Sequence, residues 1–309
     1  MNTETLLIDI GGTNLRAGVG NTSSMSISDI QKIKVDSNKH IFDVLHEINS
    51  KNNYKEIVIS AAGPVTENKI SMTNRNLEIN ASDLEKELNV NDCYLLNDWE
   101  SIGYSVPLMT KNDFKTIKRG HLESNQTCLA IGPGTGLGFS VLRHVGNVPY
   151  VYPTELGNAR SFNDYLSNLF EIEHSKNFIV LEDYLSGTGI KKIYAEKSGK
   201  NLTTEEIVSD YLDDDLATYI LNNFVIALND ILQDLALTFN ARGGIFFAGS
   251  LMRTISEMNS INYIKEEFNK HSSEAHSDIL KNISINLISK EHTPLYGNLN
   301  YSVIRRLHE

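Results

Sequence analysis

Carboxylate and carboxamide side chains at the ends of apolar runs are the first candidates for chemistry in this sequence. Asp9 lies near the end of the run Leu6–Ile10, and Asn97 with Asp98 follows the run Cys93–Leu96. Carboxylates accept hydrogen bonds, whereas asparagine both donates and accepts them. Each acid alone is equally compatible with capping a local turn. If the runs are parallel strands, however, Asn97 and Asp98 stand at their carboxyl ends, where ligands gather in such sheets.

Two glycine turns that contain a threonine are the second candidate feature. The segment Leu129–Val141 reads LAIGPGTGLGFSV, and the segment Leu6–Val19 carries Gly11-Gly12-Thr13-Asn14. Glycine lets a ligand approach bare backbone, and successive exposed amides form an anion site. Neither turn is a Walker A loop or a dinucleotide fingerprint, because both of those motifs open a helix, whereas a second strand is expected here. One such turn is compatible with an ordinary hairpin, but two of them favour a duplicated nucleotide-binding fold.

The elements that must position these residues alternate between strand and helix patterns. We expect strands at 6–10, 15–20, 57–59, 70–74, 93–98, 129–131, 139–142 and 283–288, a strand followed by a turn within 244–250, and helices at 41–48, 82–88, 162–169, 216–239, 264–268 and from about 299. Ser82 with Glu85 and Thr203 with Glu206 predict capping boxes. The stretch 111–125 is polar and lacks periodicity, and a domain join is expected near Pro107. The glycines of 182–189 are expected to break or reorient a helix. This alternation indicates a mostly parallel sheet.

Composition bounds the class of protein. The 309 residues suffice for one large or two ordinary domains, and 40% hydrophobic with 22% charged residues is typical of a soluble globular protein. A net charge of -11 argues against sequence-independent binding to nucleic acid or to anionic membranes. The two cysteines lie in apolar runs and are expected to be free and buried. No basic leader and no apolar run of membrane-spanning length is recognised, which predicts a cytoplasmic protein. The nine histidines show no metal-ligand spacing.

The order of the motifs resembles the bacterial glucokinase family of the actin-like ATPase superfamily. The likeness extends over nearly the whole chain. The matching segments are 9–16, 73–74, 96–99, 132–138, 155–158, 182, 185–189, 243–249 and 294–297. It implies an α/β fold with two actin-like (ribonuclease H-like) domains and a central cleft. The small domain is expected to hold residues 1–108 plus 297–309, the larger one residues 109–296, and the terminal helix is expected to pack on the first domain.

The resemblance also assigns site residues. Asp98 is the catalytic base that takes the proton of the sugar 6-hydroxyl, and Asp9 holds Mg²⁺, through water. The sugar contacts are Asn97, Glu155, Glu182, Asn158 at the position of a family histidine, and, as a secondary contact, Asn74. The nucleotide contacts are Gly11, Gly12, Thr13, Asn14, Gly134, Thr135, Gly136 and Gly249. Two further departures from the family pattern are Ser250 in place of a glycine and Leu77 near the position of a tryptophan.

The activity implied is that of an ATP- and Mg²⁺-dependent hexose 6-kinase at the entry to glycolysis, with glucose the favoured substrate. Homodimerisation is likewise implied by the family. Three alternatives stay open at this point. The first is a kinase for a different hexose, because Asn158 replaces the histidine. The second is a sugar-binding regulatory protein with weak catalysis. The third is an actin-like ATPase without a sugar substrate, against which Glu155 and Glu182 argue.

Overall fold

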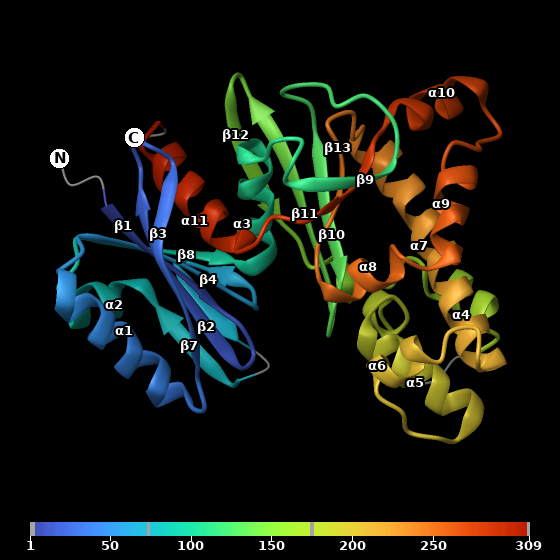
Figure 1. Ribbon diagram of the computed structural model, residues 1–309, viewed down its shortest axis with the longest axis horizontal. Helices are drawn as coiled ribbons and strands as arrows, with labels where there is room; N and C mark the ends of the chain where they lie inside the picture. The colour runs from blue at the N-terminus through green and yellow to red at the C-terminus, as the bar shows by residue number, and fades with distance from the viewer. Residues whose placement is uncertain (1–3, 73–74, 174–175, 308–309) are drawn as a thin grey trace. The chain divides into compact units, whose positions relative to one another are not determined.

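The computed structural model describes residues 4–72, 75–173 and 176–307 (Figure 1). Two compact units divide these residues. Unit 1 comprises Met1–Thr110, Asn147–Pro153 and Lys290–Glu309, and unit 2 comprises Lys111–Gly146 and Thr154–Ser289. The domain boundaries expected from the sequence stay a prediction, and each unit is described by itself below.

Unit 1 is built on a five-stranded sheet with the order β3-β2-β1-β4-β8. Its strands are β1 (Glu4–Ile10), β2 (Asn14–Asn21), β3 (Ser26–Lys34), β4 (Glu56–Ala61), β8 (Asp92–Asn97) and, outside this sheet, β5 (Val65–Thr66), β6 (Lys69–Met72), β7 (Leu77–Asn80) and β12 (Val148–Pro153). Its helices are α1 (Asn38–Asn52), α2 (Ala81–Leu88), α3 (Asp98–Ser105), η1 (Val106–Leu108), α11 (Thr293–Ile304) and η5 (Arg305–Leu307). Strands β1, β4 and β8 run parallel, and β1 with β2 forms the predicted antiparallel hairpin.

Helices cover both faces of the unit 1 sheet. The side chains of Leu6, Ile8 and Ile10 enter one core with α1 and α2, and α11 lies over the other face (Figure 1). A Cβ atom on Gly20 would come within 2.8 Å of both Leu7 and Leu299, so this glycine lets the helix approach the strand. The amide of Asn298 donates to the carbonyl of Ile8 at 2.7 Å. The terminal helix is therefore fixed to the sheet that carries Asp9.

Unit 2 repeats the hairpin and parallel strands of unit 1. Its strands are β9 (Phe114–Lys118), β10 (Cys128–Pro133), β11 (Leu137–Val145), β13 (Gly244–Phe247) and β14 (Ile285–Ile288), in the spatial order β11-β10-β13-β14-β9. Its helices are η2 (Leu156–Asn158), α4 (Asn163–Phe170), η3 (Leu181–Asp183), α5 (Gly187–Ser198), α6 (Thr204–Ser209), α7 (Asp215–Phe239), α8 (Ser250–Ile255), η4 (Asn259–Ile261), α9 (Asn262–Glu267) and α10 (Glu274–Asn282). Strands β10 and β11 pair antiparallel, and β10, β13 and β14 run parallel. The duplicated arrangement expected from the two glycine turns is thus confirmed.

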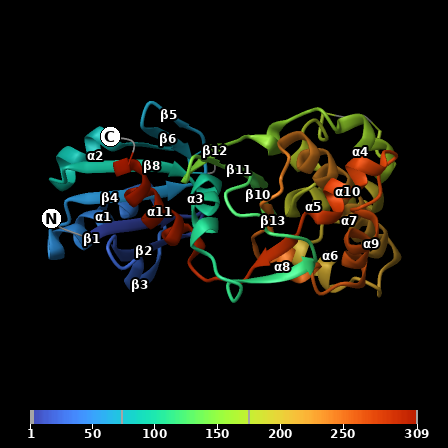
Figure 2. The same cartoon turned by 90° about the horizontal axis from the view of Figure 1, so that it is seen from above.

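The long helix α7 is the centre of the unit 2 core. At 25 residues the helix is long enough, and on average apolar enough, to cross a membrane by length and composition alone, contrary to the expectation that no run reaches that length. Its apolar side chains, however, pack with those of β10, β13 and the neighbouring helices in one hydrophobic cluster. Figure 2 shows α4, α7, α9 and α10 gathered on one side of the sheet. Such burial is typical of the core helix of a soluble protein rather than of a lipid-facing span.

The strands that were not predicted include β9 and β3, each at the edge of its sheet. β9 lies inside the stretch 111–125, where Lys118 interrupts the apolar pattern. The ammonium of buried Lys118 donates to the carbonyls of Leu280 and Ile283, at 3.1 and 2.8 Å, near the end of α10, so the charge is tolerated there. β3 is mostly exposed, and a register shift with Asp29 at φ 51° breaks its alternation. Short-range periodicity misses β9 because it pairs with the distant strand β14, and it misses β3 because the alternation of β3 is broken even though its partner β2 directly precedes it.

Helix starts were predicted with mixed success. The capping box of Thr203 and Glu206 is present at α6 and is confirmed. The one expected at Ser82 is wrong: α2 begins one residue earlier, Asn80 caps it, and Glu85 instead accepts from the amide of Cys93 at 3.1 Å. The glycines after Leu185 begin α5 behind the N-cap Ser186 rather than interrupting a helix. Cys93 and Cys128 are free and buried, as predicted.

Candidate functional site

In unit 1, Asn97 and Asp98 stand at the junction between β8 and α3. The side-chain oxygen of Asn97 accepts from the amides of Trp99 and Glu100, and Glu100 accepts from the amide of Asn97, which completes a capping box. The Asn97 amide group also donates to the carbonyl of Gly63 at 3.0 Å. Gly63 has φ +148°, and a Cβ atom there would lie 2.1 Å from the carbonyl oxygen of Ser71, so only glycine fits. Asn97 is therefore the residue that fixes the start of α3.

Asp98 is the first residue of α3 and is half-buried. Its carboxylate accepts from the amide of Trp99 at 3.0 Å. The N-terminus of a helix favours a negatively charged group, because the unpaired amides and the helix dipole both attract it. This position therefore suits a negatively charged carboxylate. The next acid, Glu100, is different, since burial raises its pKa to about 7.

The first glycine turn, Gly11–Asn14, connects β1 to β2 and is held from the side by Arg75. The amide of Gly11 donates to the carbonyl of Asn14 at 2.9 Å. Arg75 donates through Nη2 to the carbonyl of Gly12 at 2.6 Å and to that of Val35 at 3.0 Å. Gly12 and Thr13 are exposed at the tip of the turn. Arg75 thus places a cation behind a turn whose backbone faces solvent.

Asp9 lies beside this turn, near the end of β1, and only 5% of it is exposed. Arg16 Nη1 lies 2.8 Å from its Oδ2, and Ser60 donates to Oδ1 at 3.3 Å. Burial raises the pKa of Asp9, and the ion pair with Arg16 opposes that rise. No cluster of three or more His, Cys, Asp or Glu residues suited to a metal ion occurs among the residues that the structure describes. A single carboxylate agrees with Mg²⁺, which keeps most of its waters and binds few protein groups.

The second glycine turn joins β10 to β11 and is held by hydrogen bonds within the turn and from the N-terminus of α5. The amide of Gly134 donates to the carbonyl of Gly136 at 2.7 Å, which tightens the turn. The N-terminus of α5 binds its carbonyls: the amide of Gly187 donates to Gly134 and the Thr188 hydroxyl to Thr135, both at 2.7 Å. With the carbonyls bound in this way, exposed backbone remains at the tip of the turn, as an anion site needs.

The acids Glu155 and Glu182 lie next to this turn in unit 2. Glu182 Oε2 accepts from the amide of Leu137, the first residue of β11, at 3.1 Å. Glu155 accepts from the side chain of Asn158 at 3.5 Å. The pKa of Glu155 is raised by desolvation, although the residue is largely exposed; the Asn158 hydrogen bond lowers it and the charge of Glu182 raises it. Two carboxylates and an amide at one loop form a site suited to hydroxyl groups.

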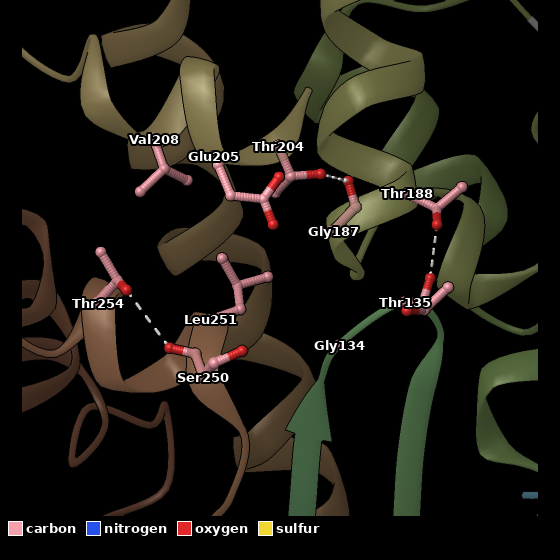
Figure 3. A pocket seen from close by; sticks show the side chains of 10 residues that line it. All are labelled: Gly134, Thr135, Gly187, Thr188, Thr204, Glu205, Val208, Ser250, Leu251 and Thr254. Atoms are coloured by element: carbon pink, nitrogen blue, oxygen red, sulfur yellow. Dashed lines mark hydrogen bonds between the residues drawn. The ribbon is translucent and has the colours of Figure 1, made fainter. Parts of the chain in front are cut away.

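A pocket of about 370 Å³ opens beside the same turn. Its lining residues come from the turn, α5, α6 and α8: Gly134, Thr135, Gly187, Thr188, Thr204, Glu205, Val208, Ser250, Leu251 and Thr254. Figure 3 shows the side chains of Glu205, from α6, and Leu251, from α8, directed into the pocket. The hydroxyl of Thr204 donates to the carbonyl of Gly187, and that of Thr188 donates to the carbonyl of Thr135. Hydroxyls, one carboxylate and two aliphatic side chains therefore surround a cavity that begins at a phosphate-sized turn.

The structure brings most of the sequence-predicted residues into two groups. In unit 1, Asp9, the turn Gly11–Asn14, Asn97 and Asp98 lie at the carboxyl ends of the parallel strands. In unit 2, Gly134–Gly136, Glu155, Asn158 and Glu182 lie around one loop, and Gly249, with φ +104°, immediately precedes the pocket residue Ser250. Asn74 lies outside the described residues.

Sequence reasoning missed Arg75, Thr204, Glu205 and Thr254, which no motif distinguishes. Thr188 lies in the segment 185–189, which matches the family pattern but to which the sequence assigns no role. All of these residues acquire their places through contacts between segments far apart in the chain. For Thr188, the available signal was its position in the first turn of a helix, two residues after the capping Ser186.

A sequence profile described as Glucokinase matches residues 6–303. The chain belongs to the glucokinase family. As a member of this family, the chain is a sugar kinase, which is a phosphotransferase enzyme. A glucokinase of Saccharophagus degradans is 26% identical over 316 residues, covering 94% of this chain and 96% of that one. A glucokinase of Helicobacter pylori strain J99 is 28% identical and covers 80% of each chain.

Solved structures confirm the fold of this glucokinase-family chain. The crystal structure of a glucokinase from an Antarctic psychrotroph superimposes with a TM-score of 0.77 at 22% identity, covering 97% of this chain and 98% of that one. A glucokinase of Balamuthia mandrillaris in complex with glucose gives a TM-score of 0.74 at 19% identity, covering 98% and 94%. The predicted α/β class with actin-like architecture is thereby confirmed.

Proposed function

We propose that the protein is an ATP- and Mg²⁺-dependent hexose 6-kinase and that glucose is its preferred substrate. The observation that carries the proposal is the adjacency, within unit 2, of a hydroxyl-binding set and a phosphate-sized turn. Glu182 belongs to the hydroxyl-binding set, and its Oε2 also accepts a hydrogen bond from the amide of Leu137, where the turn ends. Transfer of a phosphoryl group is mostly positioning and charge stabilisation, so an acceptor alcohol must be held beside the γ-phosphate. The arrangement of unit 2 supports the proposal on this point.

Asp98 is the catalytic base in this proposal. The sugar O6 attacks the γ-phosphorus, the bond from that phosphorus to the bridging oxygen of ADP breaks, and Asp98 accepts the proton of the hydroxyl. The cap formed by Asn97 fixes the start of α3, where the helix N-terminus favours a negatively charged group. Asn97 thus acts mainly by holding its neighbour, with one N–H of its amide left for a sugar hydroxyl. Products are the sugar 6-phosphate and ADP.

Sugar recognition is assigned to Glu155, Asn158 and Glu182, with Asn74 as a further contact. Carboxylates accept hydrogen bonds from hydroxyls, and the amide of Asn158 donates and accepts. Asn158 is shorter than a histidine and does not titrate near neutrality. The side chain nevertheless reaches Glu155, so the pair presents a combined acceptor and donor surface. Glucose stays preferred on this assignment because both family carboxylates are in place.

Nucleotide binding is assigned to the two glycine turns and the pocket beside the second. Gly11–Asn14 and Gly134–Gly136 offer backbone amides to phosphate oxygens, and Gly249 lets the chain pass close to the nucleoside. Val208 and Leu251 provide apolar surface for the base, while Ser250, Thr254 and Glu205 provide oxygen atoms for the ribose hydroxyls. Asp9 would hold Mg²⁺ through water, and the ion supplies charge neutralisation at the phosphates. A cytoplasmic location, expected from the sequence composition, and a homodimer, implied by the family, stay predictions.

Arg75 gives a test of the first glycine turn. Replacing it with alanine removes two hydrogen bonds to the carbonyls of Gly12 and Val35, and we expect the dissociation constant of Mg-nucleotide to rise about tenfold, within the usual range for charge-assisted bonds. Arg75→Lys keeps the charge but cannot donate through a planar fork, and it should recover only part of the affinity. Calorimetric titration of both variants measures this. An unchanged affinity of Arg75→Ala for Mg-nucleotide would show that the first glycine turn binds nucleotide without the hydrogen bonds of Arg75.

A sugar-binding regulatory protein is the second candidate, because Asn158 and Ser250 depart from the family pattern. One assay separates the candidates: ADP release is followed with Mg-ATP and a panel of hexoses, and sugar binding is measured by calorimetry in parallel. Hexose-stimulated turnover, highest with glucose, is the expected result. Binding of sugar without turnover would favour the regulatory protein, and ATP hydrolysis indifferent to every sugar would favour an ATPase without a sugar substrate.

A further inference from the structure

The segment from Glu182 to Thr188 holds the second glycine turn from both ends. At one end, Glu182 Oε2 accepts from the amide of Leu137 at 3.1 Å. At the other, the amide of Gly187 and the hydroxyl of Thr188 donate to the carbonyls of Gly134 and Thr135. One short stretch of chain therefore fixes the whole turn on which the phosphates are proposed to rest.

The carboxylate of Glu182 also lies between this turn and the loop that carries Glu155 and Asn158. A Cβ atom on Gly136 would lie 2.5 Å from Glu182 Oε2, and one on Gly157 would lie 2.8 Å from the same oxygen. Because both positions are glycine, the carboxylate of Glu182 fits between the turn and the loop. Leu181, beside it, donates its amide to the carbonyl of Ala159 at 2.9 Å, which ties η3 to the end of the same loop.

The two oxygens of Glu182 have separate environments. Oε2 binds the turn, whereas Oε1 accepts no hydrogen bond from any residue that the structure describes. A carboxylate next to a phosphate site is electrostatically unfavourable, so its presence needs a compensating role. A hydrogen bond from a backbone amide to a carboxylate is one of the stronger contacts available to a protein. Oε1 is then the atom left for a sugar hydroxyl.

We propose that Glu182 is a positioning residue for the nucleotide as well as a ligand of the sugar. Through Oε2 it holds the turn Gly134–Gly136 in its phosphate-binding form, and through Oε1 it binds a hydroxyl of the sugar. Sugar and nucleotide affinities are consequently linked within unit 2. The inference rests on the proposed function, because it takes the turn as a phosphate site and the acids as sugar ligands.

The test is the affinity for Mg²⁺ with a non-hydrolysable ATP analogue, measured by calorimetry first without sugar and then with saturating glucose. Glu182→Ala is expected to weaken nucleotide binding roughly tenfold without any sugar, as loss of a charge-assisted hydrogen bond predicts. Glu155→Ala is the matched control: it removes the other carboxylate of the sugar loop, whose hydrogen bond goes to Asn158, and should weaken only glucose binding. Glu182→Gln keeps an acceptor for the Leu137 amide and should recover most of the nucleotide affinity.

Glu182→Asp keeps the charge but shortens the side chain, so it should behave like Glu182→Ala even if the alanine variant folds poorly; thermal denaturation checks both. In the wild-type protein glucose should tighten nucleotide binding, and this linkage should vanish in Glu182→Ala and Glu182→Asp. If these variants bind nucleotide as tightly as the wild type without sugar, the positioning role is wrong while the proposed function stands. If the wild-type protein binds neither glucose nor nucleotide, both proposals are wrong.

Discussion

Replacing Asp98 with asparagine is expected to lower kcat by about 100-fold or more, the usual contribution of a positioned general base. The substitution keeps the size of the side chain and its place at the start of α3, so KM for glucose should change little. Steady-state kinetics with a coupled assay for ADP measures both constants. The Asp98→Ala variant should lose at least as much, since it too lacks a proton acceptor.

The matched control for Asp98 is Asp83, an acid in the first turn of α2 of the same unit. Asp83→Asn removes one negative charge from a comparable helix start and should leave kcat unchanged. Near-wild-type turnover in folded Asp98→Asn would show that another group, or none, accepts the proton. Circular dichroism and a melting curve establish that each variant is folded.

Replacing Glu56 with alanine is expected to lower the free energy of unfolding by about 3–5 kcal/mol, the scale for breaking a buried ion pair by removing one partner. Glu56 is 6% exposed. Its carboxylate binds Arg305 at 3.1 Å, Arg306 at 2.9 Å, Thr5 at 3.1 Å and the hydroxyl of Ser302. The side chain of Arg305 is 12% exposed. Removing Glu56 takes away the closer carboxylate of that guanidinium, since the carboxylate of Asp92 lies 3.8 Å from it.

The pH dependence of stability should reveal the same cluster. Burial acts to raise the pKa of Glu56, but hydrogen bonds from Ser302, Arg306 and Arg305 outweigh it and hold the pKa below its ordinary value of 4.5. The unfolded state then binds the proton first as the pH falls. The contribution of Glu56 to the free energy of unfolding is complete above about pH 4.5 and is lost as the pH falls through the lower pKa that Glu56 has in the folded state. Glu56→Gln should flatten this part of the stability profile.

Chemical denaturation at several pH values measures the Glu56 effects. The exposed pair of Glu47 and Lys51, 2.7 Å apart on α1, is the control, and Glu47→Ala should cost no more than about 0.5 kcal/mol. Equal losses for the two variants would contradict the assignment of Glu56 as the anchor of the terminal segment.

The features that the sequence predicted well depend on local order. The two hairpins follow from glycine turns between apolar runs, and α7 follows from apolar residues at helical spacing over many turns. The capping box at Thr203 needs only four consecutive positions. Each of these patterns is complete within a short window, so the sequence specifies it without knowledge of distant contacts.

The features that were missed depend on partners that lie outside the short window in which a sequence pattern is read. Lys118 is tolerated in β9 because carbonyls near the end of α10 surround its ammonium. Glu85 binds the amide of Cys93 instead of capping α2. Arg75 supports a turn more than sixty residues before it. The candidate site shows the same division. Its motifs could be recognised from the sequence, whereas the hydrogen bonds from Glu182 and α5 to the second glycine turn are visible only in the folded structure.

The most direct test of the sugar-kinase assignment is ³¹P nuclear magnetic resonance of the wild-type protein with Mg-ATP and glucose. We expect the γ-phosphate signal to be replaced by a phosphomonoester coupled to the C6 protons of the sugar, with ADP formed in equal amount. Inorganic phosphate in place of a sugar phosphate, or no change in the ATP signals, would contradict the account.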